Sequence, residues 1–438
     1  MSAVVVGVDL GSNSVRVLAL DADGTVADVE RATYAGAAMW PPGRADPDAW
    51  LAAVDDALKQ LERRVPDARR PAALAVGGQS PTTVPRGGGL AVTCLHPAGA
   101  TLTPDEQHAQ QWEVLRAERT DVAPMQLWDW VLWRLGAPAA QGRWPGDADL
   151  PGYGTKVATG CIAGEADGSF AVAAGTPLVP GAQDAYLAFW AGGIDTPGRA
   201  LDPGGRTGGL GVAVASGRRP AGMFALPAAA QGIDIVGGPV SAHGLMLEWW
   251  SAVTGRPVDA LLEAAAAVPA GANGVLVLPY LEGERAPRWN RDLAAEIIGL
   301  RPSTGPGEVT RAMLEASAYG LAHIARELDA RGVPTEVVVV AGSPARSALW
   351  CSIKAAVLEV PVEVPEHPEL GAYGAALAAG VAVGWWPAPG QGAGGDWPRP
   401  RVAVVAPEPD AVYRAGYERF VALGDAAERR LASLSAEG

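Results

Sequence analysis

Lysine is almost absent from this chain. Lys59, Lys156 and Lys354 are the only three, so 34 minus 3, or 31, of the basic residues are arginines. None of the three follows a glycine, which excludes a phosphate-binding loop that ends in Gly-Lys-Ser/Thr. None lies in a Val-Ala-Ile-Lys strand, which disfavours the protein kinases. If the protein binds ATP, it must do so with backbone amides, hydroxyls, arginine and metal ions.

Cysteine and long apolar runs are scarce as well. Cys94, Cys161 and Cys351 are far apart and form no Cys-x-x-Cys pair, so a disulfide framework is not indicated and a reducing compartment is favoured. No apolar run of about 18 residues is free of charged, Gly or Pro breaks. The first residues also lack the basic segment of a signal peptide. We therefore expect a cytoplasmic protein with no membrane partner.

Acidic residues outnumber basic ones, 48 to 34, and give a net charge of −14. Such a protein repels a phosphate backbone, so nucleic acid is not an expected partner. The 438 residues, 49% of them apolar, exclude general disorder and are enough for roughly two to three domains. We expect a small-molecule substrate, and a monomer or homodimer.

Strands and helices alternate along both halves of the chain, which predicts an α/β fold. In the first half, a helix begins at Pro47 behind Asp46 as its N-cap. The strands expected there are 4–8, 15–20, 25–29 and 72–76. In the second half, the expected elements are helix 308–328, strand 336–341, helix 347–358, strand 362–364 and helix 369–383. Two such units predict two similar domains that face a cleft, with the junction between residues 217 and 238.

The remaining segments have weaker patterns. Residues 105–117 and 125–135 are expected to be helical, and the Gly/Pro/Asp-rich stretch 142–154 is expected to be a loop. Residues 388–401, rich in Gly, Pro and Trp, are expected to form an exposed excursion.

The first candidate site is the hairpin that joins the first two strands. Its turn, Gly11 to Ser14, is small enough for backbone N–H groups to approach phosphate oxygens. Asp9 ends the preceding strand and could hold a hydrated Mg²⁺. Arg16 could add a fork of donors. A plain hairpin with a solvated Asp9 is the alternative.

The second candidate is Asp184, which follows a Pro-Gly turn and precedes an apolar helix. A carboxylate at this place is either an ordinary N-cap or a general base that takes a proton from an attacking hydroxyl. The third is the charged segment 278–289, in which Glu284 and Arg285 either form local ion pairs in a structural loop or take part in catalysis.

Five segments together resemble the FGGY carbohydrate kinases, the group of xylulose, glycerol, gluconate and ribulose kinases. They occur in the family's order between residue 3 and about residue 385. The segments are Asp9 to Arg16, Gly175 to Asp184, Pro279-Tyr280-Leu281-Glu282-Gly283-Glu284-Arg285, Ala341 to Trp350, and Glu369-Leu370-Gly371-Ala372-Tyr373-Gly374-Ala375-Ala376. The third of them is the most specific.

The resemblance implies two ribonuclease-H-like, actin-like domains around an interdomain cleft. Residues 1–225 would form the sugar and phosphate side, and residues 226–438 the adenosine side. It implies transfer of the γ-phosphoryl group of ATP to a sugar or polyol hydroxyl, in an atypical, short, xylulokinase-like member. In this transfer Asp184 would be the general base and Asp9 would position Mg²⁺.

The resemblance also implies the binding residues. The phosphates would be held by Gly11, Ser12, Asn13, Ser14, Arg16, Thr207 and Gly208. Gly342, Ser343 and Arg346 would hold adenosine. The substrate would contact Gln79, Ser80 and Asp184.

Several positions depart from the family's pattern. The family's Gly-Gln-Met-His-Gly is Gly78-Gln79-Ser80-Pro81-Thr82 here, and its Trp-x-Asp-x-Arg segment has no counterpart at residues 93–99. In the family's Gly-Thr-Ser turn, Arg206 replaces the Gly and Gly208 replaces the Ser. Pro344 stands where Gly is usual, which removes an N–H and fixes φ.

These departures keep a second hypothesis open, a kinase-fold protein that has lost catalysis and binds a nucleotide or sugar as a sensor or partner. A third, an ATPase of the chaperone or actin type, is disfavoured by the segment Pro279 to Arg285. Asp9, Asp184, Thr207 and Gly342 are expected to converge on one cleft.

Overall fold

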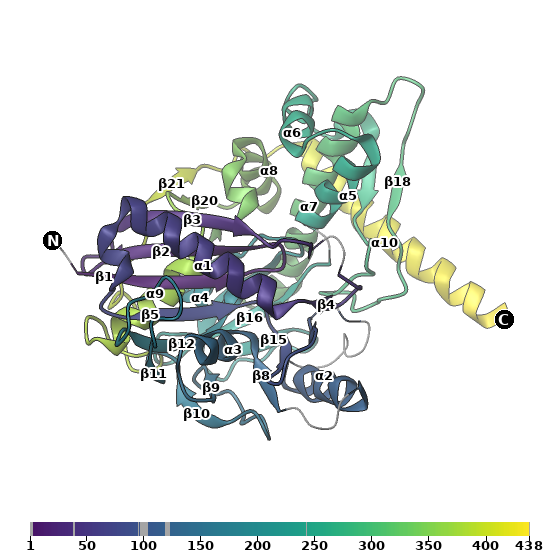
Figure 1. The fold of residues 1–438 in the computed structure, drawn as a ribbon. Coiled ribbons are helices and arrows are strands. Elements are labelled where there is room, and N and C mark those ends of the chain that lie inside the picture. Colours follow the sequence, from purple (N-terminus) through teal and green to yellow (C-terminus); the bar gives the residue numbers. More distant parts are fainter. Residues whose placement is uncertain are drawn as a thin grey trace. The chain divides into compact units, whose positions relative to one another are not determined.

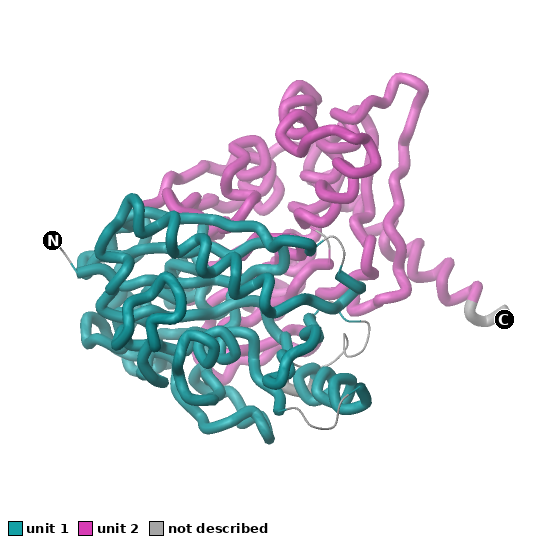
Figure 2. The backbone as a smooth tube through the Cα atoms, viewed as in Figure 1, with its two compact units in different colours: residues 1–195, 227–232, 369–400 teal, residues 196–226, 233–368, 401–438 magenta. Residues whose placement is uncertain are grey.

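The computed structural model describes residues 3–37, 40–94, 96, 104–118, 123–241 and 243–437. The chain divides into two compact units (Figure 2). Unit 1 contains residues 1–195, 227–232 and 369–400; unit 2 contains residues 196–226, 233–368 and 401–438. The chain therefore passes between the units several times, whereas the sequence predicted a single boundary at residue 225. Residues 95 and 97–99, part of the segment compared with Trp-x-Asp-x-Arg, lie outside the described residues.

Unit 1 is built on a six-stranded sheet with the order β11-β12-β5-β1-β2-β3 (Figure 1). Its strands are β1 Val4–Leu10, β2 Ser14–Asp21, β3 Val26–Thr33, β5 Leu74–Gly78, β11 Gly164–Glu165 and β12 Pro177–Gln183. The first three pair antiparallel, and β5 is parallel to both β1 and β12. The predicted hairpin strands and the strand that begins near residue 72 are confirmed.

Two helices of unit 1 pack against this sheet for reasons visible in the sequence. Helix α1, Pro47–Arg64, begins with Asp46 accepting a hydrogen bond from the Asp48 N–H at 3.0 Å, and its apolar residues are buried. Helix α9, Leu370–Ala382, packs on β1 so closely that a Cβ at Gly7 would lie 2.1 Å from the Ala372 carbonyl oxygen. The predicted Ala/Gly-rich, closely packed helix is thus confirmed.

Smaller elements complete unit 1. A second sheet has the order β4-β7-β6-β8 and a two-stranded sheet pairs β10 with β9. These elements are β4 Arg44–Ala45, β6 Thr83–Pro85, β7 Ala91–Val92, β8 Pro124–Gln126, β9 Ala140–Arg143, β10 Thr155–Ala158, η2 Pro66–Arg69, α2 Pro104–Glu118, α3 Leu127–Arg134 and α4 Asp184–Ala191. Both predicted helices are present, whereas the expected loop at 142–154 begins inside β9.

The expectation that residues 388–401 form an exposed excursion is confirmed only in part, because residues 393–396 are exposed whereas Trp397 is buried. Trp397 is 6% exposed, and its ring lies 5.7 Å from that of Trp190 in an edge-to-face contact. Its indole N–H donates to the Pro387 carbonyl at 2.8 Å. A large aromatic ring anchors this Gly- and Pro-rich segment, so composition alone misjudged its burial.

Unit 2 repeats the strand pattern of unit 1. Its sheet has the order β15-β16-β14-β13-β19-β20-β21. The strands are β13 Arg199–Asp202, β14 Gly209–Ala215, β15 Phe224–Pro227, β16 Ile233–Pro239, β19 Val337–Val340, β20 Val362–Pro365 and β21 Val402–Val405. Here β13, β14 and β16 pair antiparallel, and β19 is parallel to β13 and β20. Both sheets thus have the topology expected of ribonuclease-H-like domains.

The helices of unit 2 confirm the expected ones. Helix α7, Pro306–Asp329, is largely buried, and α8, Ala348–Leu358, begins with Ser347 accepting from the Trp350 N–H at 3.3 Å. The other elements are α5 Gly244–Thr254, α6 Val258–Ala266, η3 Ala272–Gly274, β17 Leu276–Leu278, β18 Glu296–Ile298, η4 Ser343–Arg346 and α10 Ala411–Glu437. Among the helices in the described ranges, none is both long and apolar enough to cross a bilayer.

Candidate functional site

Asp9 and Arg16 lie opposite each other in the first hairpin of unit 1. They are register partners of β1 and β2, and Nη1 of Arg16 is 3.6 Å from Oδ2 of Asp9. Asp9 is 6% exposed, and its Oδ1 has no hydrogen-bond partner within the described part of the chain. A buried carboxylate oxygen without a partner is rare and usually marks a site for a missing ligand.

The electrostatic surroundings of Asp9 favour its neutral form. Burial raises the pKa of Asp9 to about 7, and the carboxylates of Asp184 and Glu369 raise it as well, while Arg16 opposes them. The influence of Asp184 and Glu369 indicates that the three acidic side chains lie near one another. A cation at this place would restore the ionised form.

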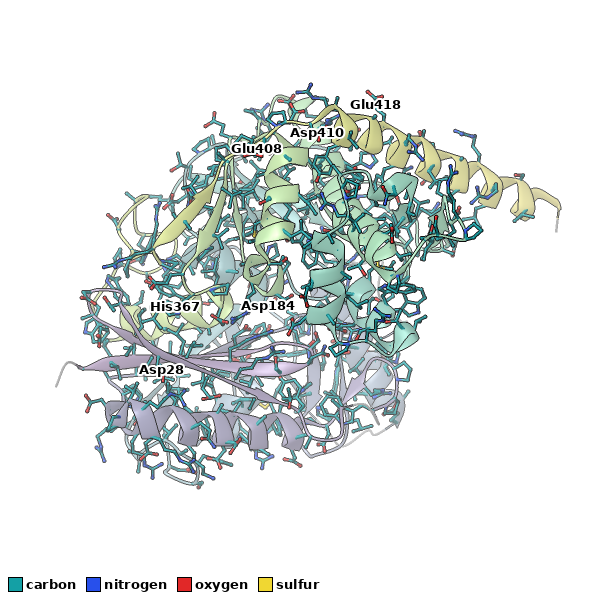
Figure 3. The ribbon with its side chains drawn as sticks, turned by 90° about the horizontal axis from the view of Figure 1, so that it is seen from above. Asp28, Asp184, His367, Glu408, Asp410 and Glu418 are labelled. Atoms are coloured by element: carbon teal, nitrogen blue, oxygen red, sulfur yellow. The ribbon has the colours of Figure 1, made fainter. Side chains whose placement is uncertain are left out.

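Asp184 is the first residue of α4, and Gln183 occupies the N-cap position in front of it. The alternative interpretation of Asp184 as the N-cap residue is therefore wrong. The Oδ1 of Asp184 accepts a hydrogen bond from the N–H of the adjacent Ala185, at 2.8 Å. Burial raises the pKa of Asp184, and the Ala185 N–H and Arg16 lower it. Figure 3 labels the side chain. Arg16 thus influences both Asp9 and Asp184.

The hairpin turn divides its small residues into two groups. Ser14 is buried, and its Oγ accepts from Nε of Arg31 at 3.0 Å. Ser12 is half-buried and Asn13 is exposed, at the tip of the turn. A Cβ at Gly11 would lie 2.4 Å from Nη1 of Arg16, so glycine is needed there for the guanidinium to lie over the turn.

Gln79 and Ser80 follow β5 at the same edge of the sheet. The N–H of Gln79 donates to the Leu10 carbonyl at 2.8 Å, at the end of β1. Gln79 is 6% exposed, and its Oε1 has no hydrogen-bond partner among the residues that the structure describes. The structure thus brings both predicted substrate residues to the end of the strand that carries Asp9.

A small recess of unit 1 forms a pocket beside these residues, with a free volume of about 20 Å³, which is room for about one water molecule. It is lined by Ser80, His108, Gln126, Trp128, Gly142, Arg143, Trp144, Asp147, Ala182, Gln183 and Tyr186. Gln183 immediately precedes Asp184. The pocket therefore begins next to the candidate base.

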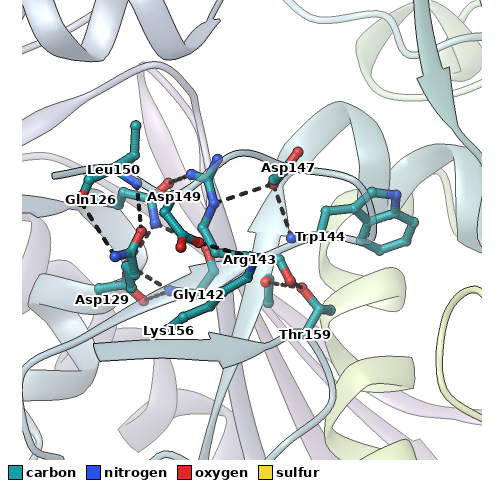
Figure 4. Close-up of polar contacts among 12 residues, drawn as sticks. Gln126, Asp129, Gly142, Arg143, Trp144, Asp147, Asp149, Leu150, Lys156 and Thr159 are labelled. Carbon is teal, nitrogen blue, oxygen red and sulfur yellow. Dashed lines mark hydrogen bonds and ion pairs between the residues drawn. The ribbon is translucent and has the colours of Figure 1, made fainter. Parts of the chain in front are cut away.

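A network of polar contacts holds one wall of this pocket (Figure 4). Nε2 of Gln126 donates to Asp129 at 2.8 Å and to the Gly142 carbonyl at 3.0 Å, and the Gly142 N–H donates to Asp129 at 2.9 Å. Oε1 of Gln126 accepts from Nη1 of Arg143 at 3.4 Å, and Nε of Arg143 lies 3.9 Å from Asp147. The network fixes the direction of the Arg143 guanidinium.

Two other lining residues carry buried polar atoms that have no protein partner within the described ranges, Nε2 of His108 and Nε1 of Trp128. Nδ1 of His108 lies 3.1 Å from the Thr83 hydroxyl. Burial lowers the pKa of His108 to about 3, with Arg143 contributing, so its imidazole is neutral. A hydroxyl-bearing ligand could satisfy these atoms.

Sequence reasoning missed His108, Gln126, Trp128 and Arg143. None belongs to a motif, and Gly142-Arg143 was placed in a loop. The local signal was the presence of two polar residues, Gln126 and Asp129, within an otherwise apolar segment, Met125 to Val131, where buried polar groups demand partners.

The candidate nucleotide residues of unit 2 lie on two neighbouring loops. Thr207 and Gly208 follow β13, and Gly342 follows β19 with a φ of 64°. A Cβ at Gly342 would lie 3.3 Å from the backbone nitrogen of Gly205, so the loops touch. Ser343 and Arg346 form the short helix η4 directly after Gly342. Their convergence with Asp9 and Asp184 stays a prediction.

Glu284 is held by its own loop. Its Oε1 accepts from the Arg285 N–H at 2.7 Å and the Ser241 N–H at 3.2 Å, while Arg285 donates to the Val240 carbonyl at 2.9 Å. Burial raises the pKa of Glu284 to about 7. These contacts support the interpretation of the segment as a structural loop. The expected ion pairs between side chains are replaced by hydrogen bonds between side chains and backbone groups.

The sequence of residues 229–383 matches the C-terminal domain of the FGGY family of carbohydrate kinases. The chain is 35% identical over 161 residues to a glycerol kinase of Gloeobacter violaceus, and the match covers 36% of this chain and 30% of that protein. It is 34% identical over 163 residues to a gluconokinase of Bacillus licheniformis, which covers 34% of this chain and 32% of that protein. The chain thus spans about a third of the length of these relatives.

The fold of the whole chain is similar to that of solved sugar kinases. A ligand-bound xylulose kinase from Lactobacillus acidophilus superposes with a TM-score of 0.75 at 17% identity, covering 97% of this chain and 98% of that one. A glycerol kinase from Plasmodium falciparum, solved with ADP, gives a TM-score of 0.68 at 14% identity, covering 98% of each chain. At these identities the likeness concerns the fold alone.

Proposed function

We propose that this chain, whose residues 229–383 match the C-terminal domain of the FGGY family of carbohydrate kinases, transfers the γ-phosphoryl group of ATP to a hydroxyl of a small sugar or polyol. The proposal is carried by the buried Asp9, whose pKa is raised by burial and by the nearby Asp184 carboxylate, together with a pocket that has unsatisfied polar atoms. Phosphoryl transfer needs mainly positioning and electrostatic stabilisation, which this constellation can supply without a catalytic lysine.

Asp184 is the proposed general base. It begins α4 directly after Gln183, which lines the pocket, and the proposal places the attacking hydroxyl beside its carboxylate. Its raised pKa makes it a stronger proton acceptor than a surface aspartate. Arg16 lies near both carboxylates and would stabilise charge on the transferred group.

Asp9 is the proposed anchor for Mg²⁺. Its buried Oδ1, which no described residue satisfies, is a suitable oxygen ligand. The described residues contain no group of three or more acidic, His or Cys side chains that could hold a metal alone. This fits Mg²⁺, which proteins often bind through one or two carboxylates together with substrate phosphates. When bound, the ion would neutralise the phosphate oxygens of the nucleotide.

The nucleotide would be held by two sets of residues. The tip of the first hairpin, Ser12 and Asn13, offers backbone amides to phosphate. In unit 2 the turn at Thr207 and Gly208 and the loop at Gly342 touch each other and would receive the rest of the nucleotide. ADP in the glycerol kinase from Plasmodium falciparum supports this assignment by analogy of fold.

A neutral, hydroxyl-rich substrate fits the pocket better than a sugar acid. Arg143, the one cation among the lining residues, lies beside Asp147 and influences the buried Asp129. A carboxylate on the substrate would meet more negative than positive charge. Trp144 and Tyr186 supply aromatic faces, and the indole N–H of Trp128 and neutral His108 supply groups for hydroxyls.

The second candidate function is nucleotide or sugar binding without catalysis. Two contacts favour it: the Ser14 hydroxyl is engaged by Arg31, and Arg206 forms an ion pair with Glu248 at 3.1 Å. Ser14 was expected to bind phosphate in the first hairpin, and Arg206 lies in the second phosphate turn. Both side chains contact other protein residues in place of a phosphate.

An ADP-release screen over ketoses, aldoses, polyols and sugar acids separates the two functions. The kinase proposal expects turnover with a neutral substrate that Asp184→Asn abolishes. Asp28→Asn is the matched control. Asp28 lies on the edge strand β3 (Figure 3) and forms an ion pair with Arg64 of α1. Binding of ADP with no turnover on any substrate would support the second function.

We also propose a cytoplasmic location and a monomeric or homodimeric state. Cys94, Cys161 and Cys351 form no disulfide among the residues that the structure describes, and Cys161 is exposed. A reducing compartment would keep such thiols intact.

A further inference from the structure

Three ionisable side chains meet in the interior of unit 2. Nζ of Lys354 lies 2.5 Å from Oδ2 of Asp202, and Nε2 of His243 lies 3.3 Å from the same oxygen. All three side chains are fully buried. They come from α8, the end of β13 and the start of α5 respectively. Lys354 is one of the three lysines of the chain.

A buried ionic cluster is seldom retained for stability alone. Removing charges from water is costly, and well-packed apolar residues of similar volume often stabilise a protein as well or better. The Asp202–His243–Lys354 cluster therefore calls for a role that apolar side chains could not fill.

The position of the His243 ring suggests that role. One face stacks on Trp350, with ring centroids 5.3 Å apart and an interplanar angle of 19°. Neither ring nitrogen makes a well-aligned hydrogen bond within the described part of unit 2, and the Nε2 contact with Asp202 is an electrostatic one at 3.3 Å. A Cβ built on Gly208 would lie only 2.6 Å from Nδ1. The imidazole thus occupies the space that a side chain at position 208 would need.

The cluster also supports the loop that carries Gly208. Oδ1 of Asp202 accepts from the Gly204 N–H at 2.9 Å. The N–H of His243 donates to the Arg206 carbonyl at 2.8 Å. The Asp202 side chain and the His243 main chain therefore hold the two halves of the segment from Pro203 to Gly208, which ends in the candidate phosphate turn.

The neighbouring charges favour one protonation state of the imidazole. Burial alone would raise the pKa of Asp202, but Lys354 and His243 outweigh it and hold the pKa well below its usual range. Burial lowers the pKa of His243, and Lys354 lowers it further against the opposing effect of Asp202. A neutral imidazole beside the Asp202 carboxylate carries its proton on Nε2. The lone pair of Nδ1 then faces Gly208.

We propose that His243, held by Asp202 and Lys354, is a positioning residue that sets the Thr207–Gly208 turn for the phosphates of a nucleotide. The inference rests on the proposed function, since the turn must bind nucleotide phosphate. Nδ1 carries no proton in this tautomer and does not donate to phosphate, so the ring acts on the turn by filling the space beside Gly208. The effect is on phosphate affinity, and adenosine affinity is independent of it.

Two substitutions of His243 separate the edges of its ring. Glutamine keeps an amide near the position of Nε2, toward Asp202, and asparagine keeps one near the position of Nδ1, toward Gly208. Calorimetric titration of the full chain with Mg·ADP and with adenosine is the measurement. His243→Gln is expected to weaken Mg·ADP binding at least tenfold with adenosine binding within twofold, and His243→Asn to recover most of the loss.

Lys354→Met provides an independent variant, because it leaves His243 in place and removes the cation that fixes Asp202. It is expected to weaken Mg·ADP but not adenosine, whereas the exposed Lys59→Met, whose partner is Asp55, changes neither. Equal losses for both ligands with a lowered melting temperature would reduce the cluster to a structural role and overturn the proposal. Unchanged Mg·ADP affinity in His243→Gln would overturn the positioning role of His243 and leave the nucleotide assignment intact. A wild-type chain that binds no Mg·ADP would overturn both.

Discussion

Gly371 leaves no room for a side chain beside Asp9. A Cβ at residue 371 would lie 2.7 Å from Oδ2 of Asp9, closer than any carbon contact allows. Gly371 lies in the first turn of α9, whose preceding residue Glu369 also influences the Asp9 carboxyl. A helix that follows Asp9 by some 360 residues of sequence thus forms one wall of the candidate metal site.

Gly371→Ala is therefore expected to disable the site without weakening the helix. Alanine favours helix formation by about 1 kcal/mol over glycine, but its methyl group must displace the Asp9 carboxylate. We expect turnover to fall at least tenfold while the melting temperature changes little. The matched control is Gly320→Ala on α7, where the nearest atom to a new Cβ is 3.4 Å away; equal activity of both variants would contradict the steric role.

The acidic pair predicts a dependence of activity on pH. Asp9 has a pKa of about 7, and that of Asp184 is raised by burial. Both must be ionised, one to hold a cation and the other to accept a proton, and a bound cation lowers the pKa of Asp9, so kcat/KM rises with pH and levels off by about pH 7. The apparent value belongs to the pair. A profile that is flat from pH 5 to 8 would contradict this assignment.

Arg143 is expected to act on the sugar and not on the nucleotide. Arg143→Gln removes a buried donor fixed by Gln126, and loss of such a contact costs about 1–3 kcal/mol. The KM of the sugar should rise roughly 10- to 100-fold, with the KM of ATP unchanged. Arg134→Gln, which alters an arginine that pairs with Asp48 at the surface, is the control and should leave both constants unchanged.

Asp129 predicts how stability depends on pH. Burial raises its pKa to about 7 from 3.8, so the folded state keeps the proton over a pH range in which the unfolded chain releases it. Stability contributed by this group is present at acid pH and is lost as pH rises from about 4 to 7. Between pH 5 and 8 the wild type should lose about 2 kcal/mol relative to Asp129→Asn. Unfolding of both proteins at the two pH values measures the difference, and a constant difference would contradict it.

Much of the fold followed from local patterns in the sequence. The hairpin strands, the Asp46 cap of α1, the Ser347 start of α8 and the small residues of α9 each carry their own signal, and each is confirmed. Trp397 shows the limit of this approach. Its burial depends on a partner, Trp190, that lies 207 residues away in the sequence.

The candidate site was predictable to the extent that motifs carry it. Asp9, Arg16 and Asp184 stood in recognisable segments, and the structure brings them together. The pocket wall was not predictable, because Gln126 and Arg143 meet only after β8 and β9 have folded against each other. Ser14 was misjudged for a related reason, since Arg31 engages its hydroxyl from the neighbouring strand β3.

The central claim is that Asp184 takes the proton of the attacking hydroxyl, and one comparison tests it most directly. Phosphate transfer from ATP is measured for wild type, Asp184→Asn and Asp28→Asn on the best neutral sugar or polyol found by screening. The account predicts that Asp184→Asn lowers kcat by about 10²- to 10⁴-fold and retains Mg·ADP affinity, while Asp28→Asn matches wild type. A kcat for Asp184→Asn within threefold of wild type would contradict it.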